Sequence, residues 1–135
     1  MWFQPAPAST PISSIGDQTK NVGPIALGIA KKPEMTLNGK FVFATVDTST
    51  AREFLEMWGK ANGVSTEYIE IPLADYDRLW PMWGKEMGAM MEFWGEYTNK
   101  SWSGEDFLTK EDLGVTAKLV STAEALAGYD SSSIL

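Results

Sequence analysis

The sequence has no cysteine and no histidine among its 135 residues. Without cysteine, the chain forms no disulfide and offers no thiolate to a substrate or a metal. Without histidine, it lacks the usual general base at neutral pH and the most common ligand of metal ions. These two absences exclude a serine–histidine triad, a cysteine nucleophile and a typical zinc site. They suit a reducing compartment, and we expect a cytoplasmic protein.

Positive charge is scarce as well. Eleven lysines and arginines stand against eighteen acidic residues, which gives a net charge of −7 at pH 7. The basic residues are scattered along the chain, whereas nucleic-acid binding depends on clustered cations that displace counterions from phosphates. We therefore expect no nucleic-acid partner.

The third absence is that of long apolar runs. No stretch of about 18 apolar residues could span a bilayer, so no membrane span is expected. The start, "MWFQPAPASTPISS", lacks the positively charged and apolar parts of a secretory signal. Its three prolines restrict the backbone and remove hydrogen-bond donors, which favours an extended lead-in over residues 1–15.

Helix and strand patterns alternate after this lead-in. Apolar residues recur every three or four positions in residues 17–31, and Pro24 suits a first turn, so the regular helix is predicted to begin near Asn21. "GKFVFATVD" is nearly all apolar, which predicts a strand covered on both faces. The alternating "TEYIEIPL" predicts a second strand that ends at Pro72. The predicted helical face comprises Val22, Ile25, Ala26, Ile29 and Ala30.

Capping residues mark two further helices. Thr50 and Glu53 form a predicted capping box before a helix with a buried stripe of Phe54, Leu55 and Trp58, and Asn62-Gly63 ends it. Ser121 and Glu124 repeat the box before a helix that ends at Gly128, and residues 129–135 are expected to fray. Between these helices, residues 73–128 are predicted to be helical only, with a short helix ended by Pro81. The order predicts an α/β fold, although two clear strands are few for an independent sheet.

Methionine and tryptophan gather in the helix that follows Pro81. Their spacing places five of them on one helical face, which has two interpretations: packing in the core, or the wall of a pocket for a hydrophobic small molecule. Gly84 and Gly88 are interpreted as points of close helix contact. The acidic residues Glu86, Glu92 and Glu96 are interpreted as a solvated face, and no metal site is predicted. The candidate pocket residues are Trp83, Met87, Met90, Met91 and Trp94.

The order of these pieces resembles the C-terminal half of an NmrA-like protein, an atypical branch of the short-chain dehydrogenases and reductases. The resemblance rests on "SSIGDQTKNVGPIALGIAKKPE", "GKFVFATVD", "FLEMWGKANG", "LWPMWGKEMGAMMEFWGEY" and "DFLTKEDLGV", over about residues 11–128. It implies a partial Rossmann-type fold, with the last sheet units in residues 17–72 and a helical substrate-side subdomain in residues 73–128. It also implies NAD(P) as the cofactor.

The sequence departs from the family pattern at the nucleotide site. It has no "GxGxxG" or "GxxGxxG", and no tyrosine is followed four residues later by lysine. We therefore assign no catalytic and no cofactor-binding residue, and expect a truncated protein that lacks the Gly-rich nucleotide-binding half.

Three functions remain open at this stage. The leading hypothesis is the substrate-side portion of an NAD(P)-linked reductase of fungal secondary metabolism, acting on a hydrophobic carbonyl or enone. The alternatives are a non-catalytic regulator that binds a protein partner, and a lone lipophile-binding protein. Unpaired sheet edges would favour a protein partner or a homodimer.

Overall fold

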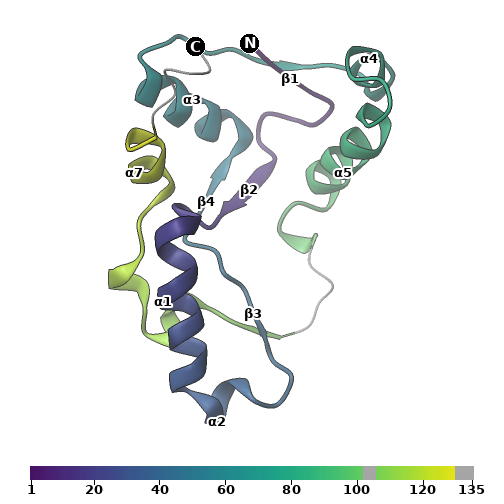
Figure 1. The fold of residues 1–135 in the computed structure, drawn as a ribbon. Coiled ribbons are helices and arrows are strands. Elements are labelled where there is room, and N and C mark those ends of the chain that lie inside the picture. The colour runs from purple at the N-terminus through teal and green to yellow at the C-terminus, as the bar shows by residue number, and fades with distance from the viewer. Residues whose placement is uncertain (102–105, 130–135) are drawn as a thin grey trace. The chain divides into compact units, whose positions relative to one another are not determined.

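The computed structural model describes residues 1–101 and 106–129 (Figure 1). The chain forms two compact units, each built from two separate stretches. Unit 1 comprises Met1–Ile12 and Ser49–Ser103, and unit 2 comprises Ser13–Thr48 and Gly104–Leu135. This division differs from a sequential one, because the chain leaves unit 1 early and returns to it.

The described strands are short and form three pairs. β1 is parallel to β5 and β3 is parallel to β6, while β2 pairs with β4. Helices flank these pairs, which confirms the predicted α/β class and is consistent with a partial Rossmann-type fold. The two predicted strand segments, "GKFVFATVD" and "TEYIEIPL", contain all or part of three of these short strands, but β6 shows that the prediction of helices only in residues 73–128 was wrong. The strands are β1 (Trp2–Gln4), β2 (Pro11–Ser14), β3 (Phe41–Val42), β4 (Asp47–Thr50), β5 (Tyr68–Glu70) and β6 (Phe107–Leu108).

The prediction of one continuous buried strand through "GKFVFATVD" was also wrong. Only β3 at its start and the first residue of β4 at its end are strand, and Phe41 is half exposed. The segment changes partners on the way. The amide of Phe43 donates to the carbonyl of Leu108 at 2.8 Å. The amide of Val46, three residues on, donates instead to the carbonyl of Ser14 at 2.7 Å. A strand that exchanges one neighbour for another within a few residues cannot form a single ladder.

Helix α1 (Gln18–Lys31) begins earlier than the predicted start near Asn21. The carboxylate of Asp17 accepts from the amide of Thr19 at 3.0 Å, so the cap lies before the proline rather than beside it. Pro24 is therefore inside the helix, which lacks the hydrogen bond that its amide would have donated to Lys20.

The other predicted helix signals are confirmed. α3 (Ala51–Asn62) has both halves of the Thr50–Glu53 capping box and ends at Gly63, whose φ is 66°. α7 (Thr122–Ala127) has the same box from Ser121 and Glu124. Most of the predicted frayed end, residues 129–135, lies outside the described residues. The remaining helices are α2 (Pro33–Thr36), α4 (Leu73–Leu79), α5 (Gly84–Tyr97), α6 (Lys110–Leu113) and the 3₁₀ helices η1 (Thr98–Lys100) and η2 (Thr116–Lys118).

The core of unit 2 lies between α1 and the segment from α6 to η2. It contains Ile25, Leu113 and Val115. Gly28 lets the helix approach closely, since a Cβ there would lie 2.9 Å from Val115 Cγ1. The predicted apolar face of α1 was partly wrong, because Val22 is 52% exposed.

In unit 1, α5 lies beside α4 (Figure 1) and packs through its glycines. A Cβ at Gly88 would lie 2.3 Å from Leu73 Cδ1, and one at Gly84 would lie 2.9 Å from Asp77 Cα. The interpretation of both glycines as points of close helix contact is confirmed. Every helix of the described residues falls short of the length and apolarity that crossing a membrane requires.

Candidate functional site

An apolar cavity of about 290 Å³ lies in unit 1. Its lining comes from the N-terminal strand β1 and the residue before it, together with one face of α3. No charged side chain contributes to this lining. The lining residues are Met1, Trp2, Phe54, Leu55 and Trp58.

The start of α3 positions three of these side chains. The capping box at Thr50 fixes where the helix begins, so the angular position of each later residue follows. Phe54 and Trp58 are four residues apart and therefore lie one above the other on the same helical face, with Leu55 beside them. All three are half-buried, because the cavity separates them from full packing.

Aromatic contacts hold Trp2 against this face. Its ring lies 6.3 Å from that of Phe54 and 5.7 Å from that of Tyr68, which it meets at 80°, close to edge-on. The Tyr68 hydroxyl donates to the Ala6 carbonyl at 2.7 Å. The wall is thus fixed by the hydrogen bond from the Tyr68 side chain to the Ala6 backbone on one side and by ring packing on the other.

Tyr68 is not suited to acid–base chemistry. Burial, with a smaller contribution from the charge of Glu70, raises its pKa to about 12. Burial also raises the pKa of Tyr76. A general acid works best with a pKa near the working pH, so both phenols fit structural roles.

Within the part of the chain that the structure describes, no group of three or more acidic side chains is placed to bind a metal ion. Glu86, Glu92 and Glu96 are all exposed, as the interpretation of a solvated face requires.

The five candidate pocket residues from the sequence lie together on one face of α5, and none of them lines the cavity beside β1. Trp83 and Trp94 are 47% and 39% exposed, so they are not core residues. Met87, Met90 and Met91 are half-buried. The core interpretation therefore fails for the two tryptophans, while a pocket at this face stays a prediction.

Sequence reasoning missed the cavity although it noted each wall. Phe54, Leu55 and Trp58 were predicted to form a buried stripe, and Trp2 was placed only in the extended lead-in of residues 1–15. The signal in the sequence was the presence of large aromatic side chains in both segments. The indole of Trp2 is stabilised by packing on another ring, and Phe54 and Trp58, four residues apart, form a flat apolar surface on one face of a helix.

Short strand pairs and flanking helices define a mixed α/β protein, which carries an apolar hollow beside its first strand. A family model described as the NmrA-like family matches residues 1–126, and the chain belongs to that family. No curated protein and no solved structure matches the chain.

NmrA-like proteins are typically associated with NAD(P), whose pyrophosphate binds where a glycine turn leads from a strand into a helix. Gly16 is at such a position, between β2 and α1, with a φ of 64°. In a nucleotide site, such a glycine leaves room for the phosphates, and the helix amides point at them. Here a Cβ at Gly16 would lie 2.2 Å from the Val120 carbonyl oxygen, so the chain itself occupies that space.

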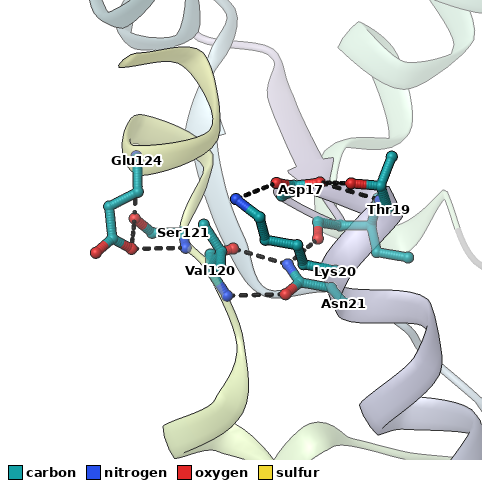
Figure 2. A network of polar contacts seen from close by, with 8 residues as sticks. Asp17, Thr19, Lys20, Asn21, Val120, Ser121 and Glu124 are labelled. Carbon is teal, nitrogen blue, oxygen red and sulfur yellow. Dashed lines mark hydrogen bonds and ion pairs between the residues drawn. The ribbon is translucent and has the colours of Figure 1, made fainter. Parts of the chain in front are cut away.

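The helix end is occupied as well (Figure 2). The Asp17 carboxylate accepts from the amide and the hydroxyl of Thr19 at 3.0 and 2.6 Å and pairs with Lys20 at 3.0 Å. These hydrogen bonds, led by that of the Thr19 side chain, lower the pKa of Asp17 to about 2, so the group is an anion at neutral pH. An anion at the helix N-terminus repels a phosphate. The residues at this turn do not fit NAD(P).

Proposed function

We propose that this chain provides the substrate side of an NmrA-like, NAD(P)-linked reductase of small-molecule biosynthesis, of fungal type and acting in the cytoplasm. In this proposal the cavity beside β1 binds a hydrophobic carbonyl or enone. The observation that carries it is the apolar lining by residues of β1 and α3. Family membership supports the reductase part.

The lining supports the choice of ligand. A mostly apolar wall without a charged side chain favours a neutral molecule, because a charge would lose its hydration and gain no side-chain partner. Pockets for small molecules span about 300–1,000 Å³, so a cavity of about 290 Å³ is suited to a small ligand. The indoles of Trp2 and Trp58 offer flat faces for a planar one.

The role of the described residues is to bind and orient this molecule against an open apolar wall. They are not proposed to transfer hydride, since the turn at Gly16 does not fit the cofactor and the buried Tyr68 does not fit a proton donor. Nucleotide-binding residues would have to come from outside the described part of the chain.

Filling the cavity tests the proposal. Leu55→Trp replaces a wall residue by a larger ring that fills part of the cavity. Binding of menadione, a flat apolar enone, is therefore expected to weaken at least about tenfold. Titration calorimetry with both proteins would measure this. The matched control is Leu79→Trp, the same change at an exposed position on α4.

Equal binding by the Leu55→Trp variant and the native protein would show that the ligand does not occupy this cavity. Loss of binding in both variants would point to a general effect of the added tryptophan, which also counts against the site.

A second prediction concerns the cofactor. The isolated chain is expected to show no NADPH oxidation above the buffer rate with menadione, because Asp17 and Val120 occupy the space that the pyrophosphate would need. The loss of NADPH absorbance measures the rate, and calorimetry with NADPH alone measures binding. Sustained turnover by the purified chain would contradict the proposed division of labour.

A further inference from the structure

Helix α5 carries an apolar seam, which we define as Trp83, Met87, Met90, Trp94 and Tyr97. Trp83 stands just before the first residue of the helix and Tyr97 is its last. Successive members are four, three, four and three residues apart. Within the helix, this spacing places Met87, Met90, Trp94 and Tyr97 on one face. Trp83 precedes the first turn, and its ring lies 6.3 Å from that of Trp80.

The seam remains largely exposed in the structure. Trp83, Trp94 and Tyr97 are 47%, 39% and 46% exposed, and Met87 and Met90 are half-buried. Large aromatic side chains exposed along one seam are unusual for a protein surface that meets only water.

The glycine-bearing side of α5, about a third of the way around the helix from the seam, explains why the seam is not packed against α4. Gly84, Gly88 and Gly95 lie on that side, where a Cβ would come within 3.0 Å of Asp77, Leu73 and Pro7, respectively. Side chains as large as the seam residues could not replace these glycines in the contact. The helix is therefore fixed with its glycines inward and its aromatic residues outward.

The spacing selects the kind of partner. Apolar residues alternating at three and four positions let a second helix pack knobs-into-holes at a crossing angle of about 20°. Methionines in the middle adapt to differently shaped side chains, as in proteins that receive amphipathic helices in a groove. The seam thus matches a helix with apolar residues at the same spacing.

Charge selects the partner further. Residues 73–97 carry five acidic side chains and two basic ones, and one of the basic ones, Arg78, already pairs with Asp75 at 2.9 Å. Glu86 is three residues from Trp83 and four from Met90, so it borders the seam. A second copy of this chain would bring the same acidic groups together at a net charge of −7 per chain. A basic helix would neutralise them.

We propose that the α5 seam is a docking surface for a basic amphipathic helix of a partner protein. The apolar residues of that helix would pack on the seam, one of its lysines or arginines would face Glu86, and its positive charge would be attracted by the acidic excess of residues 73–97. This surface is separate from the cavity beside β1, so ligand binding and partner binding can be tested independently.

The test uses a synthetic peptide of about 20 residues, long enough to form a helix, with leucine at alternating three- and four-residue spacing and lysine elsewhere. Fluorescence anisotropy of the labelled peptide is expected to show saturable binding to the full chain. Trp94→Glu is expected to weaken it at least about tenfold, because a charge enters the middle of the seam. Ala89→Glu adds the same charge at an exposed position of α5 outside the seam and should leave affinity within about twofold.

Two control peptides separate the contributions. A scrambled leucine–lysine peptide tests the spacing, and a version with glutamate in place of lysine tests the charge; both are expected to bind at least about tenfold more weakly. Equal binding of either control, or equal binding to the Trp94→Glu variant, would overturn the proposal. So would light scattering that showed a dimer of the native chain abolished by Trp94→Glu, because the seam would then bind a second copy.

Discussion

Asn21→Leu is expected to lower the free energy of unfolding of unit 2 by about 3 kcal/mol or more, since each polar group left without a partner costs about 1–3 kcal/mol. Asn21 is fully buried. Its side-chain amide donates to the carbonyls of Ile15 and Val120, both at 2.7 Å, and accepts from the amide of Val120 at 2.8 Å (Figure 2). Leucine is close in size, so it fills the space and leaves these three backbone groups without partners or water. Urea unfolding followed by circular dichroism measures the effect.

The matched control is Asn38→Leu, the same change at an exposed turn position in unit 2. Surface substitutions usually change stability by less than about 0.5 kcal/mol. A similar small effect at both positions would mean that the three hydrogen bonds of the Asn21 side chain, here called the clamp, do not hold the segment at Val120 in place.

Gly16→Ala is the second substitution with a large expected effect, a loss of about 2–4 kcal/mol. Two costs add. The φ of 64° is strained for any residue with a Cβ, and that Cβ would lie 2.2 Å from the Val120 carbonyl oxygen, which is a backbone atom. Backbone cannot rotate away as a side-chain end can, so α1 or the Val120 segment must move.

Gly39→Ala separates the two costs. Its φ is 70°, but nothing lies within 4 Å of an added Cβ. Only the backbone strain of about 1–2 kcal/mol is expected there. If thermal or urea unfolding gave the same loss at Gly16 and Gly39, close packing of the β2–α1 turn on Val120 would be disproved.

Local signals in the sequence predicted the helices well. The capping boxes at Thr50 and Ser121 require only residues three positions apart. Gly63, after Asn62, ends α3 because glycine adopts the left-handed backbone conformation without strain. The family resemblance was carried by the order of such pieces. It could therefore be seen without any knowledge of which segments touch.

Long-range contacts were the part that the sequence could not supply. "GKFVFATVD" has the composition of a buried strand, yet its neighbours in space change along its length. The start of α1 is set by the Asp17 cap. The preference of proline for a first turn instead predicted a start near Asn21, because the sequence does not show that Pro24 is tolerated inside the helix. The cavity required knowing that Trp2 meets α3, more than fifty positions along the chain, which no periodicity reveals.

The clamp between Asn21 and Val120 joins residues that are 99 positions apart, and this separation matters while the protein is being made. Ribosomes add about 5–20 residues per second, so α1 would wait on the order of 5–20 seconds for its partner segment. Met1–Ile12 is synthesised before α1 and Ser49–Ser103 within that interval, so unit 1 can fold first. Until residue 115 has emerged, Ile25 has no Val115 to pack on, and the nascent chain exposes an unfinished apolar face to chaperones and to other chains.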